Sequence, residues 1–339
     1  MPHTSAPMQM IVRWIAYCVI ACMFRGAVPA AAEALSEQQQ AQILDEAQSS
    51  YDRAANLLAG REIYRLSTFS PDGAPALSSA GVAVPAAPLP GRGSGLGTVF
   101  VCAGGSPRDW HYPTVLACLR QLAREGVRIG GISGGPYLLA AAGLLADRDF
   151  TIHWEHAPAL LESFPTLSPR QARFVVDGNR ITCGGGVAPL DMMHVLISER
   201  MGPDFARRVS DWYLHTEVGE PTAPQRGSLA ERYGVHHPGL LSVLEKMEET
   251  IEMPLDRAAM ARIAGVTPRH LDRLFAAHLA STFLDQYRRI RLQHARRLLE
   301  QSPLSISEIA VATGFSSGAH FSRAYRNLYD MAPSETRRS

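Results

Sequence analysis

The stretch SISEIAVATGFSSGAHFSRAYRNLYDMAPSETRR, residues 305–338, decides the fold of the C-terminal part of the chain, because it predicts a helix, a tight turn and a second helix. Apolar residues recur at helical spacing on both sides of Gly314, and Phe315 and Phe321 belong to the predicted core. The second helix exposes small, polar and basic residues: Ser317, Gly318, Ala319, His320, Ser322, Arg323 and Arg326. Such a face fits a DNA major groove, where arginine reaches guanine edges or phosphates. A helical hairpin with an ordinary solvated face is the alternative that this pattern alone leaves open.

The same pattern occurs about 50 residues earlier, in DRAAMARIAGVTPRHLDRLFAAH at 256–278. Gly265 marks the turn, and Thr267 is a good N-cap with Pro268 at the first helical position. A helix over QYRRIRLQHARRLLEQS, 286–302, joins the two units, with its apolar residues inward and its five arginines outward. The sequence therefore predicts two helix-turn-helix units on one connecting helix, with two recognition helices on one side.

Charge is divided between the two parts of the chain. Residues 256–339 hold 13 Arg, no Lys and 7 Asp or Glu, a net charge of +6, and the remainder holds 20 basic and 25 acidic residues, a net charge of −5. Neutralisation of phosphates provides most of the sequence-independent affinity for DNA. A basic module of this kind is typical of duplex binding.

The chain before this module has a different pattern. A length of 339 residues suggests two domains, and residues 216–239 lose apolar periodicity and gain Pro and Gly, which indicates a linker with one short helix. Upstream, strand-length apolar runs such as GTVFVCAGG alternate with helical segments. This alternation predicts a parallel sheet with helices on both faces.

One turn in the predicted α/β domain has the glycine pattern of a nucleophile elbow. GGISGGP, residues 130–136, lies between a predicted strand and a predicted helix, with Ser133 at its centre. His153 follows 20 residues later near the expected sheet edge, but the spacing identifies no acidic third member of a triad.

Residues 240–338 resemble the DNA-binding domain of the AraC/XylS family of bacterial transcriptional regulators. The resemblance is carried by AGVTPRHLDRLF, by ARRLL, by EIA with GFSS and HFSRAYR, and by the closing Pro333-Ser334-Glu335. It implies double-stranded DNA as the partner, with RNA polymerase as a second one. The candidate DNA contacts are Thr267, Arg269, His270, Asp272 and Arg273 in the first unit, and Ser317, Gly318, Ala319, His320, Arg323 and Arg326 in the second.

Residues from about 50 to 215 resemble the PfpI-like, class I glutamine-amidotransferase-like sensor domain of a large AraC subgroup. VFVCAGG, VRIGGISGGPYLLAAAGLLADR, TIHWEHAPALLESFP and TCGGGVAPLDMMHVLI carry this resemblance. Enzymes of this fold have cysteine where this chain has Ser133, and serine is activated less readily than a thiol. The substitution favours a ligand pocket without catalysis, formed by Ser133, Gly134, His153 and Trp154, although a hydrolase or amidase that uses Ser133 is the alternative. Relatives sense amino acids or quaternary amines, and Trp154 with Trp110 could face a cation.

The N-terminal segment 1–34 is atypical. Residues 10–34 hold Arg13, an 11-residue apolar run and an alanine-rich tract, as a secretory signal peptide does. Export would separate the recognition helices from DNA, so we interpret residues 11–22 as the first strand of the sensor domain, or the segment as an artefact of the chosen start. The five cysteines, scattered in apolar runs, fit neither a disulfide framework nor a zinc site.

Together these patterns predict an α/β, flavodoxin-like sensor domain over 35–215, a linker over 216–239 and an all-α DNA-binding domain over 240–339. The expected protein is a cytoplasmic, homodimeric transcriptional activator that responds to a small-molecule effector. It is expected to have no enzyme activity, no cofactor, no metal and no membrane partner.

Overall fold

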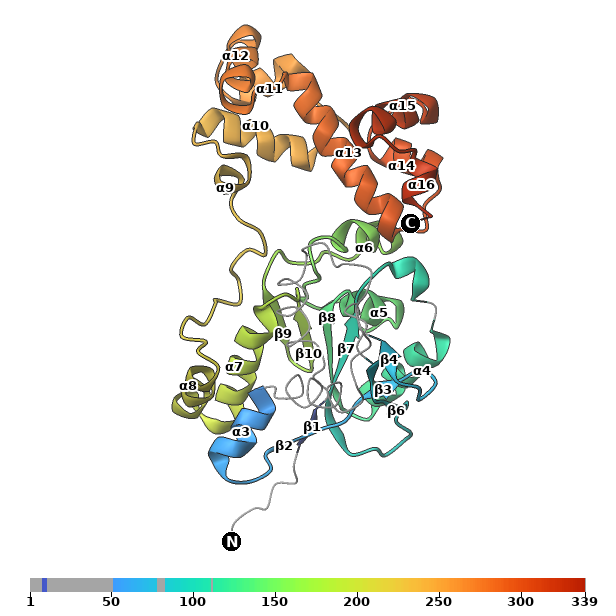
Figure 1. Cartoon of the computed structure of the whole chain (residues 1–339), viewed down its shortest axis with the longest axis vertical. Helices are drawn as coiled ribbons and strands as arrows, with labels where there is room; N and C mark the ends of the chain where they lie inside the picture. The colour runs from blue at the N-terminus through green and yellow to red at the C-terminus, as the bar shows by residue number, and fades with distance from the viewer. Residues whose placement is uncertain (1–7, 11–50, 78–82, 111, 339) are drawn as a thin grey trace, which may run out of the picture. The chain divides into compact units, whose positions relative to one another are not determined.

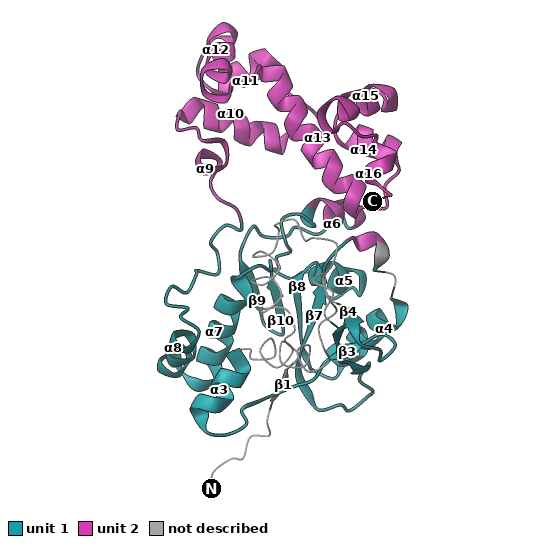
Figure 2. Ribbon diagram, in the orientation of Figure 1, with its two compact units in different colours: residues 1–105, 110–157, 164–225 teal, residues 106–109, 158–163, 226–339 magenta. Residues whose placement is uncertain are grey.

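The structure, a computed structural model, describes residues 8–10, 51–77, 83–110 and 112–338. The chain forms two compact units (Figure 2). Unit 1 comprises residues 1–105, 110–157 and 164–225, and unit 2 comprises residues 106–109, 158–163 and 226–339.

A six-stranded sheet forms the centre of unit 1, in the order β2-β1-β7-β8-β10-β9. Neighbouring strands are parallel except for β9 and β10, which form an antiparallel pair at one edge. The strands are β1 (Met8–Met10), β2 (Tyr64–Leu66), β7 (Leu96–Ala103), β8 (Arg128–Ser133), β9 (Phe174–Asp177) and β10 (Arg180–Cys183). Two short pairs lie outside this sheet: β3 (Phe69–Ser70) with β6 (Ala87–Pro88), and β4 (Ala76–Leu77) with β5 (Ala83–Val84). The predicted α/β fold with a parallel sheet is confirmed.

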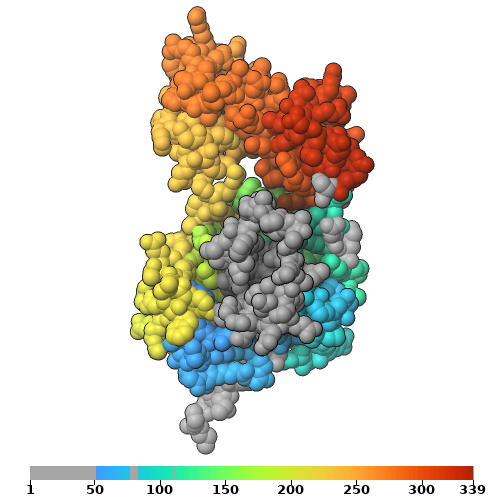
Figure 3. All heavy atoms as spheres, in the orientation of Figure 1, coloured from blue at the N-terminus to red at the C-terminus, as the bar shows by residue number. Residues whose placement is uncertain are grey.

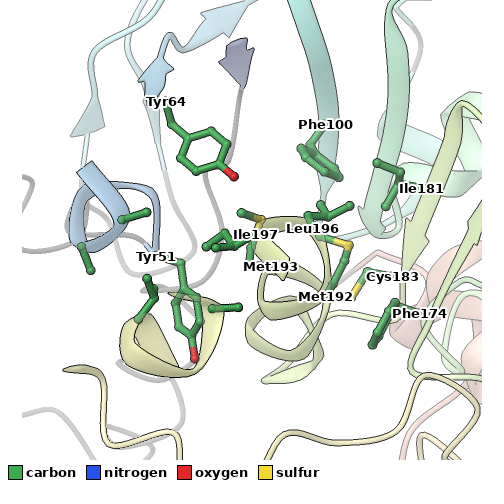
Figure 4. Close-up of a cluster of buried hydrophobic side chains, with 14 of the residues drawn as sticks. Tyr51, Tyr64, Phe100, Phe174, Ile181, Cys183, Met192, Met193, Leu196 and Ile197 are labelled. Carbon is green, nitrogen blue, oxygen red and sulfur yellow. The ribbon is translucent and has the colours of Figure 1, made fainter. Parts of the chain in front are cut away.

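Helices cover both faces of this sheet (Figure 1). One face carries α3 (Tyr51–Ala59), α7 (Ala188–Met201) and α8 (Pro203–Trp212), and the other carries α4 (Pro113–Arg124) and α5 (Gly135–Ala141). On the first face, Met192, Met193 and Ile197 of α7 pack toward Phe100 and Ile181 of the sheet (Figure 4). The short helices η1 (Pro107–Asp109) and α6 (Ala157–Ser163) complete the elements before α7.

The start of the chain differs from the prediction. The first described strand is Met8–Met10, which precedes the segment 11–22 that the sequence assigns to that strand, and residues 11–22 lie outside the described residues. The next element that the structure describes is α3. Within the described residues, every helix is too short or too polar to cross a lipid bilayer.

Residues 216–225, which the sequence assigns to a linker, are part of unit 1. The carbonyl of Pro221 accepts hydrogen bonds from the backbone amides of Arg173 (2.9 Å) and Phe174 (3.4 Å), and the amide of Gly219 donates to Asp191 (2.7 Å). Unit 2 continues from Arg226.

Unit 2 consists of helices (Figure 1). It includes η1 and residues 158–163 of α6, and its other helices are α9 (Leu229–Tyr233), α10 (Pro238–Glu249), α11 (Arg257–Ile263), α12 (Pro268–Leu279), α13 (Phe283–Gln301), α14 (Ile306–Ala312), α15 (Gly318–Tyr329) and α16 (Pro333–Thr336). Helix α13 divides its apolar residues between two cores: Phe283, Tyr287 and Ile290 pack with α10–α12, whereas Leu292, Ala295, Leu298 and Leu299 pack with α14 and α15. The predicted design of two helix-turn-helix motifs on one connecting helix is therefore present. Figure 3 shows the first motif as an orange lobe and the second as a red lobe.

Candidate DNA interface and ligand pocket

Both recognition helices begin at a side-chain cap. The hydroxyl of Thr267 accepts a hydrogen bond from the amide of His270 (3.3 Å) at the start of α12, and the hydroxyl of Ser317 accepts one from the amide of His320 (3.2 Å) at the start of α15. Because these hydroxyls satisfy amides that the helix leaves free, the starts of α12 and α15 are fixed. The predicted cap at Thr267 is confirmed.

The candidate DNA contacts lie on the outer faces of α12 and α15. Exposed side chains belong to Thr267, Arg269, Arg273, Ser317, Ala319, His320, Arg323 and Arg326, and partly exposed residues are His270, Asp272 and Gly318. No ion pair joins Arg269, Arg323 or Arg326 to another described residue, so their guanidinium groups can reach DNA without first breaking one. Phe315 and Phe321 are buried in the core, as the sequence predicts.

Asp272 is paired within the protein. Its carboxylate accepts a hydrogen bond from Nη1 of Arg257 on α11 at 2.8 Å. This ion pair neutralises the one acidic candidate on α12, so its charge does not repel a phosphate backbone as a free carboxylate would.

A cleft of about 280 Å³ between α13 and α15 was not predicted. Arg288 and Arg289 of α13 line it together with His320, Arg323 and Asn327 of α15, and Asp285 forms an ion pair with Arg288 at 2.8 Å. The prediction that all five arginines of α13 point outward is wrong for Arg291. Its guanidinium lies 4.1 Å from the centre of the Phe315 ring, and its Nε donates to the carbonyl of Thr313 at 2.7 Å.

Ser133 occupies a strained turn between β8 and α5. Its φ of +60° is in the left-handed region, and the residue as a whole is 8% exposed. A Cβ atom at Gly135 would lie 1.9 Å from the carbonyl oxygen of Val101, and one at Gly134 would lie 2.1 Å from Trp110, so the turn requires both glycines. This is the geometry of an elbow.

The residues of the predicted pocket do not all meet in one cavity. A cavity of about 200 Å³ is lined by His153, Trp154, Arg173, Gly184, Gly185, Gly186, Val187, Ala188 and Gln225. Ser133 and Gly134 are absent from this described lining. A Cβ atom at Gly185 would lie 3.1 Å from Cβ of Ser133, so Ser133 lies directly behind the cavity wall. Burial lowers the pKa of His153, which favours a neutral imidazole.

Trp110, which the sequence groups with Trp154, lines a different cavity of about 380 Å³ with residues of β7 and α4. Its indole N–H donates to the carbonyl of Gly104 at 3.2 Å, and its ring packs edge-on against Tyr137 and His156. The two tryptophans therefore cannot enclose one cation.

Arg173 and Gln225 line the cavity of about 200 Å³, here called the elbow cavity, and no sequence pattern selects them. They are more than 50 residues apart and flank no recognisable motif. Among the described residues no cluster of His, Cys, Asp and Glu could hold a metal ion. Burial raises the pKa of the Cys183 thiol to about 12, so this cysteine is a buried apolar residue rather than a thiolate.

Comparison with known proteins agrees with both units. Residues 260–339 match a family model for a helix-turn-helix domain, and residues 61–199 match the model of the DJ-1/PfpI family. The chain is 65% identical over 287 residues to the HTH-type transcriptional regulator GlxA of Rhizobium meliloti, covering 84% of this chain and 89% of that protein. It is 40% identical to CdhR (81% and 82% covered) and 34% identical to GbdR (84% and 78% covered), both HTH-type transcriptional regulators of Pseudomonas aeruginosa.

These matches extend over most of the chain and over most of each relative. They join the same two parts that the structure describes, a PfpI-like sheet domain and a paired helix-turn-helix domain. The chain therefore belongs to the family of AraC-type transcriptional regulators that carry an N-terminal DJ-1/PfpI domain.

Proposed function

We propose that this regulator binds a specific operator through α12 and α15, and that a small nitrogen-containing metabolite, an amino acid or a quaternary amine, controls it from the cavity at the elbow. The observation that carries the DNA-binding part is the pair of capped recognition helices on α13. At 1.5 Å per residue this 19-residue helix is about 28 Å long, which is comparable to the roughly 34 Å between successive major-groove turns.

The sensor role is supported by the position of the cavity, which lies next to the elbow and is lined by His153 and Trp154. An indole face can accept a quaternary amine, and the imidazole can orient a polar group. A ligand changes the activity of the regulator only if it binds one arrangement of the protein better than another. We further propose a cytoplasmic homodimer that acts as an activator through RNA polymerase.

Arg323→Ala tests the operator contact. If this guanidinium reads a base edge, the variant loses about 1–3 kcal/mol of specific binding and discriminates less at one operator position, whereas binding to random DNA changes little. Fluorescence anisotropy on operator and random duplexes measures both affinities. Arg120→Ala, an exposed arginine of α4 in unit 1, is the matched control. An unchanged ratio of operator to random affinity in Arg323→Ala contradicts the assignment.

A serine hydrolase is the second candidate, and the elbow conformation of Ser133 is the observation that favours it. Two findings support a non-catalytic role instead. No side-chain hydrogen bond joins Ser133 to His153 among the described residues, and the contact between them is the backbone bond from the His153 amide to the Ser133 carbonyl at 3.1 Å. A serine nucleophile needs a base within hydrogen-bond reach of its hydroxyl.

A further inference from the structure

The segment from Tyr213 to Gln225, here called the arm, connects the last helix of unit 1 to Arg226 of unit 2. It begins with the ring of Tyr213 stacked on Tyr51 of α3, with 5.0 Å between ring centres. His215 then hydrogen-bonds to the hydroxyl of Tyr51 through Nδ1, and its Nε2 lies 3.0 Å from Oδ1 of Asp191. The arm is thus held to unit 1 by specific polar contacts.

Asp191 of α7 is the centre of these contacts. Its side chain is only 1% exposed, and it accepts hydrogen bonds from the Gly219 amide of the arm (2.7 Å) and from Nε of Arg173 (2.9 Å) and its Nη2. A Cβ atom at Gly219 would lie 2.9 Å from both side chains, so the arm backbone packs directly on the Arg173–Asp191 pair. Docking of the arm therefore fixes Arg173.

The other end of the arm closes the elbow cavity. The two side-chain N–H groups of Gln225 are shared among three acceptors, the hydroxyl of Thr151 (2.9 Å) and the carbonyls of Ile152 (2.9 Å) and Ala172 (2.7 Å), and its oxygen accepts from the amide of Trp154 (2.9 Å). A Cβ atom at Gly184 would lie 2.6 Å from Cδ of Gln225. Gln225 is thus both a wall of the cavity and the last residue of unit 1.

The cavity has the chemistry of an anion site. Arg173 is the permanently charged residue of its described lining, and no carboxylate belongs to that lining. The 14-residue helix α7 begins at Ala188, which also lines the cavity, so the positive end of its dipole lies there. Asp191 takes Nε and one Nη2 hydrogen of this guanidinium, which leaves Nη1 and the second Nη2 hydrogen as the pair suited to a planar two-oxygen group.

We propose that the elbow cavity binds the carboxylate of its ligand through Arg173, and that ligand binding and docking of the arm stabilise each other. The ligand contacts Arg173, which the arm positions through Asp191, and it contacts Gln225 directly. The ligand therefore binds more tightly when the arm is docked than when it is undocked. By the same coupling, a bound ligand stabilises the docked arm. The inference rests on the proposed sensor function and names the chemical group that the sensor recognises.

Hydrogen exchange of the arm amides in the full-length protein tests this inference. The probes are glycine betaine, L-arginine and acetate at millimolar concentration, each paired with a compound that lacks the carboxylate: choline, agmatine and acetamide. A carboxylate at ten times its Kd should slow, by about tenfold, the exchange of those arm amides that exchange only when the arm undocks. The paired compound without a carboxylate should have no effect. If no carboxylate slows exchange in the arm, or if the partners slow it equally, the inference is wrong.

Two variants separate recognition from simple loss of structure. Arg173→Lys keeps the charge near Asp191 but loses the two-pronged geometry. The variant should bind the carboxylate probe that slows exchange about tenfold more weakly. Gln225→Ala should speed arm exchange without ligand and reduce the slowing that the carboxylate causes. Arg120→Lys and Gln293→Ala, at exposed positions that do not line the cavity, are the controls and should behave as the unmodified chain does.

Fluorescence anisotropy on operator DNA with the same samples distinguishes failure of the carboxylate-site inference from failure of the proposed DNA-binding function. Operator binding without carboxylate protection overturns the inference and leaves the DNA-binding function intact. Carboxylate protection without operator binding overturns the proposed function and supports the ligand site.

Discussion

At the scale of single residues, Ser133 has a strained, left-handed backbone conformation. A non-glycine residue in the left-handed region costs roughly 1–2 kcal/mol, and such strain is typical of functional sites. In this chain the strained turn brings Ser133 up behind Gly185, at the wall of the elbow cavity. We interpret the turn as what remains of a catalytic architecture that now shapes a pocket.

Ser133→Ala tests that interpretation. Because the hydroxyl is not needed for binding in a sensor, the variant should retain operator binding and its response to effector, with changes in either affinity below about threefold. Reporter transcription and anisotropy measure both. Loss of the effector response together with loss of a measurable hydrolytic turnover in the unmodified protein would instead show that Ser133 is a nucleophile.

His294 of α13 makes the stability of the folded protein depend on pH. Burial, helped by the charge of Arg297, lowers its pKa from 6.5 to about 4 in the folded protein. The unfolded chain therefore takes up a proton between pH 6.5 and 4 that the folded chain does not, and stability falls as the pH falls through that window.

His294→Gln removes this titration. At pH 5 the imidazole should cost the unmodified protein about 2 kcal/mol of unfolding free energy relative to pH 7, and the variant should not show this part of the loss. Urea unfolding at both pH values, followed by circular dichroism, measures the difference. Equal losses in both proteins would mean that His294 is solvated.

At the scale of elements, the two helix-turn-helix units have similar turns with different surroundings. Gly265 and Gly314 both have left-handed φ angles, +67° and +70°. A Cβ atom at Gly265 meets nothing within 4 Å, whereas one at Gly314 would lie 2.7 Å from the carbonyl oxygen of Ile251 and 2.8 Å from that of Glu252. Backbone atoms cannot move aside as side chains do.

Substitution by alanine at the two glycines should therefore have unequal effects. Gly265→Ala adds only backbone strain and should cost about 1 kcal/mol, because part of that strain is offset by a less flexible unfolded chain. Gly314→Ala adds a clash and should cost roughly 2–5 kcal/mol. Urea unfolding of the two variants compares them directly, and equal costs would contradict the close approach at Gly314.

The same elements show what sequence reasoning could reach. Recognition helices, their caps and the glycine turns depend on residues within a few positions of each other, so Thr267, Gly265 and Gly314 could be identified from spacing, whereas the sequence selects Ser317 as a DNA contact and not as a cap. The inward position of Arg291 could not, because it depends on Phe315 arriving from another helix. The cavity residue Gln225 contacts residues 53 to 74 positions away, and no local pattern encodes such contacts.

At the scale of the whole molecule, the chain joins a basic helix-turn-helix part to an acidic part that contains the DJ-1/PfpI-like domain. The net charge of +6 over residues 256–339 is held by arginine alone, which favours phosphate and guanine recognition over non-directional attraction. The acidic remainder keeps the net charge of the chain at +1. Sequence composition revealed this division, whereas the docking of residues 216–225 on unit 1 required the structure.

The central claim, that this chain reads a specific DNA sequence through two recognition helices, is tested most directly by fluorescence anisotropy. Full-length protein is titrated with duplexes from upstream of its own gene and its neighbours, over a range of salt, with random duplex as competitor. We predict tight binding that survives the competitor and weakens with salt, with a slope of log K against log salt of roughly −5 if about six phosphates are neutralised. Binding no tighter than to random DNA, with and without candidate effectors, would contradict the account.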